Sequence, residues 1–120
     1  MNILIPGGAG YIGSHMVKYA QDIGHEVTVI DNFSTGNKWS ISECEIINLD
    51  LLDKDKLFKV LKGRYFDGVI HFAAKSLVGE SFVRPDIYYQ NNVIGSINLI
   101  NFLLENDIQN LVFSSTAAIF

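Results

Sequence analysis

Four glycines crowded between two apolar runs constrain the fold of this chain more than any other feature. Gly7, Gly8, Gly10 and Gly13 follow a short apolar run at residues 2–5 and open a segment of helical periodicity. The spacing reads GxGxxG from Gly8 and GxxGxxG from Gly7. Such a loop lacks Cβ atoms, so backbone N–H groups can approach a pyrophosphate at the positive end of the following helix. A plain strand-to-helix turn also favours glycine, and the loop alone leaves both interpretations open.

Short runs rich in valine and isoleucine alternate with helical stretches along the chain. We predict strands at residues 2–5, 26–30, 45–49, 68–72 and 110–114, with the composition of strands covered on both faces. This alternation is typical of βαβ units on a parallel sheet. With right-handed crossovers, the predicted strand order is 3-2-1-4-5, half of a doubly wound, Rossmann-type α/β sheet.

Three helices are predicted from apolar residues at helical spacing. The first helix carries one stripe made of Ile12, Met16, Ala20 and Ile23. It ends at Gly24, which stands where a terminating glycine is common. The second helix covers residues 53–62 and turns three side chains inward, Leu57, Phe58 and Leu61.

The third predicted helix, residues 91–104, is apolar around much of its circumference. One stripe consists of Val93, Ile97, Ile100 and Leu104. Four more apolar residues widen it, Ile94, Leu99, Phe102 and Leu103. A helix this apolar is expected to be buried on more than one side, either as plain core or with a second copy of the chain.

Asp31 supplies the second sign of a dinucleotide site. It ends the second predicted strand, roughly 20 residues beyond the glycine loop, where an acidic side chain accepts hydrogen bonds from the adenosine ribose hydroxyls. The alternative is a solvated carboxylate at a strand end. An acid at this position repels a 2′-phosphate, so the residues favour NAD over NADP as cofactor.

Composition excludes several classes of protein. The 120 residues are 48% apolar and 18% charged with a net charge of −4, and no basic stripe suits nucleic acid or an anionic membrane. No apolar stretch approaches the roughly 20 residues of a membrane helix. Cys44 is the single cysteine, which favours a reducing cytoplasm. His15, His25 and His71 lack metal-ligand spacing, and no metal site is expected.

Six segments occur in an order that carries a family resemblance. They are GGAGYIGSH at 7–15, VIDN at 29–32, HFAA at 71–74, LVGES at 77–81, YYQNN at 88–92 and FSSTAAIF at 113–120. Together they resemble the UDP-glucose 4-epimerase family of the extended short-chain dehydrogenases/reductases, over nearly the whole chain. The resemblance implies interconversion of UDP-glucose and UDP-galactose through a 4-keto sugar, with tightly held NAD, in a homodimer that pairs the helix at 91–104.

The resemblance also assigns roles to individual residues. The pyrophosphate loop would comprise Gly7, Gly10, Tyr11, Ile12 and Gly13. The ribose would meet Asp31 and Asn32, and adenine would meet Asp50 and Leu51. Further cofactor contacts would come from Phe72, Ala73, Ala74 and Asn91, with Ser114 on the nicotinamide side. The catalytic hydroxyl bonding the sugar 4-oxygen would be that of Thr116.

Three departures from the family pattern stand out. Pro6 replaces the usual threonine before the first glycine, and Ser76, beside Lys75, stands where many members have lysine. No tyrosine has a lysine four residues later, so the Tyr-x-x-x-Lys base is missing from these residues. We therefore expect residues 1–120 to be the N-terminal part of an NAD-binding domain without its substrate domain. The alternatives are another NAD-dependent sugar-nucleotide epimerase or dehydratase, and a non-catalytic NAD-binding module.

Overall fold

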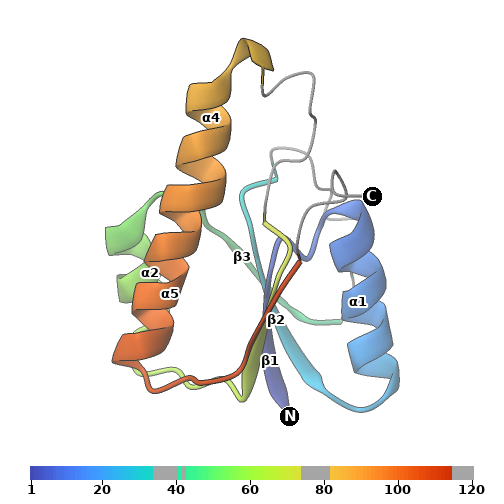
Figure 1. The fold of residues 1–120 in the computed structure, drawn as a ribbon. Coiled ribbons are helices and arrows are strands. Elements are labelled where there is room, and N and C mark those ends of the chain that lie inside the picture. The colour runs from blue at the N-terminus through green and yellow to red at the C-terminus, as the bar shows by residue number, and fades with distance from the viewer. Residues whose placement is uncertain (34–40, 42, 74–81, 115–120) are drawn as a thin grey trace.

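The computed structural model describes residues 1–33, 41, 43–73 and 82–114, and these form one five-stranded parallel sheet with helices on both faces (Figure 1). The strands are β1 (Asn2–Pro6), β2 (Glu26–Asp31), β3 (Glu45–Asn48), β4 (Gly68–His71) and β5 (Leu111–Phe113). Their order in the sheet is β3-β2-β1-β4-β5. The five predicted strands, their parallel pairing and the doubly wound order are confirmed.

The sheet separates two hydrophobic layers because successive strand residues point to opposite faces. In β1, Ile3 and Ile5 pack with Val17 of α1 (Tyr11–Asp22) on one face. Leu4 points to the other face, where it packs with side chains of α2 (Lys54–Val60) and α5 (Gly95–Glu105). Figure 1 shows α1 on one side of the sheet and α2 with α5 on the other. The outer strands are less covered, and all of β5 is exposed among the described residues.

The predicted stripe of α1 is confirmed at Ala20, which is buried, and at Met16, which packs partly buried against the core, and it is wrong at its two ends. The helix buries Gly13, Val17 and Ala20, while Ile12 and Ile23 are more than half exposed. The reason lies in the glycine loop, because Gly13 has to face the loop backbone where a Cβ would overlap the Gly7 carbonyl oxygen. This close approach rotates the helix and leaves the larger side chains outside. The inward face predicted for α2 is confirmed, with Leu57 and Leu61 fully buried and Phe58 packed against the same cluster.

The third predicted helix begins earlier and contains an irregular turn. The helix α4 (Pro85–Tyr89) continues through a π-helical turn, η2 (Gln90–Ile94), directly into α5. The helix was expected to be buried on more than one side, but within the described chain α5 buries only one face. That face carries Asn98, Leu99 and Phe102, whereas Val93, Ile97, Ile100 and Leu104 all stay exposed.

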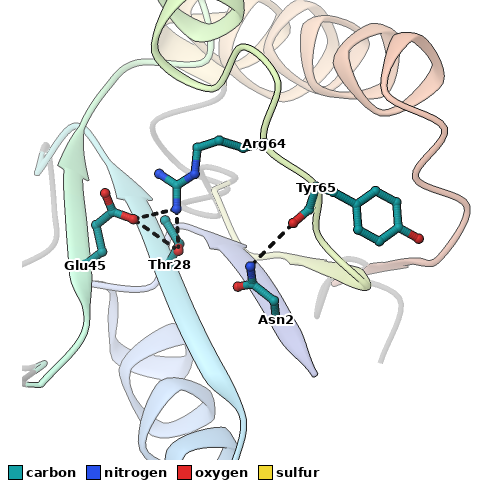
Figure 2. Close-up of polar contacts among 5 residues, drawn as sticks. All are labelled: Asn2, Thr28, Glu45, Arg64 and Tyr65. Carbon is teal, nitrogen blue, oxygen red and sulfur yellow. Dashed lines mark hydrogen bonds and ion pairs between the residues drawn. The ribbon is translucent and has the colours of Figure 1, made fainter.

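Polar contacts close the amino-terminal end of the sheet (Figure 2). The Arg64 guanidinium lies 2.6 Å from Oε1 of Glu45 at the start of β3, and 3.4 Å from the hydroxyl of Thr28 in β2. Nearby, the Asn2 side-chain amide donates to the carbonyl oxygen of Tyr65 at 3.4 Å. Among the residues described, no helix combines the length and apolarity that crossing a membrane requires.

Candidate dinucleotide site

Most of the predicted site residues that the structure describes lie at the carboxyl ends of β1 to β5 or in η2. This is the edge where open α/β sheets bind ligands, beside the switch in strand order between β1 and β4. Four elements bring these residues together: the glycine loop, the end of β2, the end of β3, and the turn after β4 with the facing turn of η2. Ala74 and Thr116, together with Lys75 and Ser76, lie outside the described residues.

Three of the loop glycines are required by the fold itself, and a Cβ on Gly8 would lie 2.8 Å from a methyl group of the buried Val29. Gly7 has a φ of +79°, and a Cβ there would lie 2.5 Å from the backbone nitrogen of Ala73. At Gly13, a Cβ would overlap the backbone of Gly7. Gly10 differs, because its ideal Cβ meets only the Gly7 carbonyl oxygen, at 3.4 Å. Gly10 is therefore the glycine of the motif whose absent side chain the packing of this chain does not explain.

The backbone N–H groups of the glycine loop already donate hydrogen bonds to other groups of the protein. The donors of four successive residues are paired: Gly7 N–H with Ile30 O at 2.7 Å, Gly8 N–H with Ile5 O at 3.2 Å, Ala9 N–H with Asp31 Oδ2 at 3.0 Å, and Gly10 N–H with Gly7 O at 3.1 Å. The first bond of α1 runs from Ser14 N–H to Gly10 O, and no side chain caps the helix. The N–H groups of Tyr11, Ile12 and Gly13 thus have no acceptor within the helix.

These three N–H groups could hold an anion. They lie at the positive end of the α1 macrodipole, next to a residue without a side chain, and this arrangement suits a phosphate group. The side chains of Tyr11 and Ile12 are 83% and 62% exposed, so they stand clear of the core. Sequence analysis predicts the pyrophosphate contacts at Gly7, Gly10, Tyr11, Ile12 and Gly13. In the structure, the last three of these residues are the ones whose N–H groups have no acceptor within the helix.

Asp31 is fixed at the end of β2 by two backbone donors. Its Oδ2 accepts from Ala9 N–H at 3.0 Å, and its Oδ1 accepts from Phe33 N–H at 2.7 Å. Asp31 is only 9% exposed, so the predicted alternative of a solvated strand-end carboxylate is wrong. A carboxylate offers about four lone-pair positions. The two backbone bonds therefore orient Asp31 and leave acceptor capacity on both oxygens.

The end of β3 lies beside Asp31 and joins the same edge. The Asn32 side-chain amide donates to Oδ2 of Asp50 at 3.2 Å, and Oδ1 of Asp50 accepts from Leu52 N–H at 2.9 Å. Leu51 is buried, and its carbonyl oxygen accepts from the Asn98 amide of α5 at 2.7 Å. The structure thus brings together Asp31, Asn32 and Asp50, while the side chain of Leu51 belongs to the core.

The turn after β4 forms the other half of the edge. Phe72 N–H donates to the Pro6 carbonyl oxygen at 2.8 Å, so the proline at that position still contributes an acceptor to the sheet. The Asn91 amide of η2 donates to the Ala73 carbonyl oxygen at 3.2 Å. At the end of β5, Ser114 N–H donates to the His71 carbonyl oxygen at 3.1 Å. Three predicted contacts, Phe72, Ala73 and Asn91, therefore lie within one bonded unit.

His71 is the residue in this region that sequence reasoning left out. The residue is 2% exposed, and burial lowers the pKa of its ring from the usual 6.5 to about 4. The ring nitrogens contact Ala73 N–H and the Ser96 hydroxyl, at 3.2 Å and 3.0 Å. The sequence offers two signals for this residue, its place in the HFAA segment and its polar side chain in an otherwise apolar strand. Neither assigns it a role in the site.

Comparisons with a family model, with known sequences and with solved structures all find epimerases. The model of the NAD dependent epimerase/dehydratase family matches residues 3–120. A UDP-glucose 4-epimerase of Halalkalibacterium halodurans is 47% identical over 118 residues, covering 98% of this chain and 35% of that protein. A crystal structure of a UDP-glucose 4-epimerase superposes with a TM-score of 0.93 at 47% identity, over 98% of this chain and 36% of the other.

A second solved structure carries a ligand. The UDP-glucose 4-epimerase from Brucella ovis, in complex with NAD, superposes with a TM-score of 0.92 at 39% identity. The match covers 98% of this chain and 36% of that one. The chain thus spans about a third of the length of the relatives it matches.

Proposed function

Because the chain belongs to the NAD dependent epimerase/dehydratase family, we propose that the complete protein is a UDP-glucose 4-epimerase and that this chain forms its NAD-binding part. The observation that carries the proposal is the 47% identity to a UDP-glucose 4-epimerase, sustained over 98% of the chain. The glycine loop, the oriented Asp31 and the Asn91–Ala73 contact supply the geometry that such a cofactor needs.

The residues of this chain fit a dinucleotide on both sides of the strand-order switch. The first-turn N–H groups of Tyr11, Ile12 and Gly13 would bind the pyrophosphate, and the open space at Gly10 would admit it. On the β2–β3 side, Asp31 and Asn32 would bind the adenosine ribose, and Asp50 would lie beside adenine. On the β4–β5 side, Ala73, Asn91 and Ser114 would face the nicotinamide half.

Asp31 supports NAD over NADP. Its two backbone donors hold the carboxylate at the end of β2, so the charge cannot swing away from an incoming 2′-phosphate. A buried carboxylate facing a phosphate is a repulsive element against the wrong cofactor. In the complete protein we expect NAD to bind tightly and NADP weakly, with Asp31→Asn narrowing the difference.

The bound cofactor would take a hydride from the sugar C4 and return it to the opposite face of the 4-keto sugar. Within this chain we assign the hydroxyl that bonds the sugar 4-oxygen to Thr116, on the FSSTAAIF pattern alone. None of the five tyrosines here is followed by lysine four residues later. We therefore place the tyrosine base and the uridine-diphosphate contacts in the rest of the protein.

The exposed face of the long helix supports a homodimer. Val93, Ile97, Ile100 and Leu104 follow 4-3-4 spacing, and each is between 39% and 72% exposed. This spacing forms one continuous apolar stripe, of the kind that pairs with another helix. The partner we propose is the same helix of a second copy of the protein, as the family resemblance implies.

A charge in the stripe tests the dimer. Ile100→Glu in the complete protein should give monomer or aggregate in sedimentation, because a buried unpaired carboxylate opposes pairing. Tyr19→Glu is the matched control, since Tyr19 is 60% exposed on α1, on the opposite face of the sheet. An Ile100→Glu protein that remains a dimer would exclude this face as the interface.

The single cysteine supports a cytoplasmic location, because no disulfide can form within the chain. We propose UDP-glucose and UDP-galactose as substrates, with neither nucleic acid nor membrane as a partner. The proposal for the substrate extends beyond the chain described here, so its test requires the complete protein.

The deciding assay follows conversion of UDP-galactose to UDP-glucose by the complete protein. Turnover without added reductant, with NAD retained through purification, is the expected result. Turnover of a different nucleotide sugar would replace the substrate assignment and keep the enzyme class. NAD binding without turnover of any nucleotide sugar would favour the non-catalytic module and overturn the proposal.

A further inference from the structure

The peptide of Ala73, in the turn after β4, is held from both sides. Its N–H donates to Nδ1 of His71 at 3.2 Å, and its carbonyl oxygen accepts from the Asn91 amide at 3.2 Å. His71 also contacts the Ser96 hydroxyl through Nε2, at 3.0 Å. Ser96 lies in the first turn of α5, directly after the π-helical turn that carries Asn91. The contacts therefore form a closed ring between β4 and the long helix.

These contacts determine the protonation of His71. Because Ala73 N–H is a donor, Nδ1 must carry a lone pair, and the neutral ring then has its proton on Nε2. Nε2–H donates to the Ser96 hydroxyl. The ring also packs edge-on against Phe113 of β5, with 5.3 Å between centroids. The imidazole is thus fixed in position and in tautomer by three elements of the fold.

The ring lies on one side of the strand-order switch. β4 and β5 are separated from β2 and β3 by β1, and Asp31, Asn32 and Asp50 belong to the β2–β3 side. Asn91 reaches Ala73 from η2, where the helix departs from regular α geometry. A π-helical turn inside a longer helix is often found at functional sites because it redirects a side chain. Here the redirected amide depends on an acceptor that His71 holds in place.

We propose that His71 is a positioning residue for the nicotinamide half of the dinucleotide site. By accepting from Ala73 and donating to Ser96, it fixes the turn after β4 against the helix that presents Asn91. The inference rests on the proposed NAD binding and adds to it a residue that does not itself touch the cofactor. A residue acting this way affects one half of the ligand and leaves the adenosine half unchanged.

The test compares NAD with ADP as ligands of the complete protein, stripped of cofactor and titrated by calorimetry. His71→Leu removes both ring contacts and should weaken NAD binding about tenfold or more, the typical effect of losing a buried hydrogen bond. ADP carries the adenosine and pyrophosphate but no nicotinamide riboside, and its affinity should change less than about twofold. A loss shared equally by both ligands would mean general loosening of the fold and overturn the inference.

A second substitution, His71→Asn, distinguishes a positioning role of His71 from a role in packing alone. Asn carries its Oδ1 the same number of bonds from Cα as the Nδ1 of histidine, so His71→Asn restores the acceptor for Ala73 N–H. It should recover most of the NAD affinity lost in His71→Leu. Recovery no better than in His71→Leu would contradict the role of the Ala73 contact.

A second variant keeps the inference testable if His71→Leu fails to fold. Ser96→Ala removes only the hydroxyl that anchors Nε2, and Ser96 is partly exposed. It should weaken NAD binding about threefold, with ADP unaffected. Unchanged NAD affinity in folded Ser96→Ala would overturn the proposal. Wild-type protein that binds neither NAD nor ADP would instead refute the proposed function.

Discussion

The two ends of the sheet use polar groups differently. At the amino-terminal end, side chains pair with one another or with nearby main chain, as Arg64 does with Glu45 and Asn2 with the Tyr65 carbonyl (Figure 2). At the carboxyl end, beside the Asn32–Asp50 and His71–Ser96 pairs, side chains hold the backbone of the loops. Asp31 accepts from the N–H groups of Ala9 and Phe33, and the Ala73 peptide is bonded on both sides.

From this difference we infer that the amino-terminal end of the sheet contributes to stability and the carboxyl end to ligand binding. Pairs at the amino-terminal end are partly exposed, so each contributes only modestly to stability. Bonds at the carboxyl end fix the course of three loops and leave the first N–H groups of α1 without an acceptor in the helix. A site of this kind is set by backbone placement. Substitutions that move backbone at the carboxyl end should have large effects, and those at the other end small ones.

Gly13→Ala should have the largest effect of any substitution considered. The new Cβ would overlap the Gly7 carbonyl oxygen, so α1 must move away from the loop and from the sheet. We expect a loss of about 3 kcal/mol or more in the free energy of unfolding, in the upper range for overpacking. The measurement is the thermal midpoint of the complete protein without NAD.

Gly68→Ala is the control for Gly13. Gly68 begins β4, and a Cβ there would lie 3.7 Å from the nearest neighbour, which is ordinary contact. Its thermal midpoint should stay near that of the wild type or rise slightly, because alanine reduces the entropy of the unfolded chain. Equal losses at Gly13 and Gly68 would show that glycine content, and not the close approach of helix to loop, determines stability.

The buried His71 should make the carboxyl end sensitive to acid. Its folded pKa, about 4, lies below the usual value of 6.5, so between these two pH values the unfolded chain binds a proton that the folded one excludes. Stability is therefore highest above pH 6.5 and is lost as the pH falls towards 4. The loss is on the order of 3 kcal/mol, since each pKa unit corresponds to about 1.4 kcal/mol.

His71→Asn isolates this contribution. The variant cannot take up the proton, so its thermal midpoint should decline less than that of the wild type between pH 7.5 and pH 4.5. Other groups, including Glu45, titrate alike in both proteins and cancel in the comparison. His15→Asn is the matched control, because it makes the same substitution at an exposed histidine of α1. Parallel profiles for wild type and His71→Asn would contradict the buried neutral ring.

Gly10 should separate binding from folding within the loop. Its Cβ would meet only the Gly7 carbonyl oxygen at 3.4 Å, so Gly10→Val should fold with a loss of about 1 kcal/mol, typical of a poorer helix cap. The branched side chain would occupy the approach to the first-turn N–H groups. NAD affinity measured by calorimetry should fall about 100-fold, with Gly10→Ala intermediate. Near-unchanged affinity in Gly10→Val would refute the proposed phosphate position.

The sequence predicted the features that depend on the periodicity of apolar residues and on the order of strands and helices along the chain. The five strands, the 3-2-1-4-5 order, the inward face of α2 and the location of Asp31 all follow from alternation and spacing. The two ends of the α1 stripe did not, because a glycine has no hydropathy signal although its missing Cβ sets the helix rotation. The π-helical turn and the contact of His71 with Ser96 also lack a sequence signature. That contact joins β4 to a residue 25 positions later in the chain, so it depends on how the helix packs against the sheet.

The smallest effect is expected from Arg64→Met at the amino-terminal end. Methionine keeps an apolar stem for packing near Phe66 and removes the guanidinium that bonds Glu45 and holds the pKa of that carboxyl below its usual range. Glu45 and Arg64 side chains are 52% and 34% exposed, so the pair should contribute less than about 1 kcal/mol. A double-mutant cycle with Glu45→Gln measures that coupling, and NAD affinity should be unchanged in all three variants. A fall in NAD affinity in Arg64→Met would mean that the two ends of the sheet are coupled, and the division between a stabilising end and a binding end would not hold.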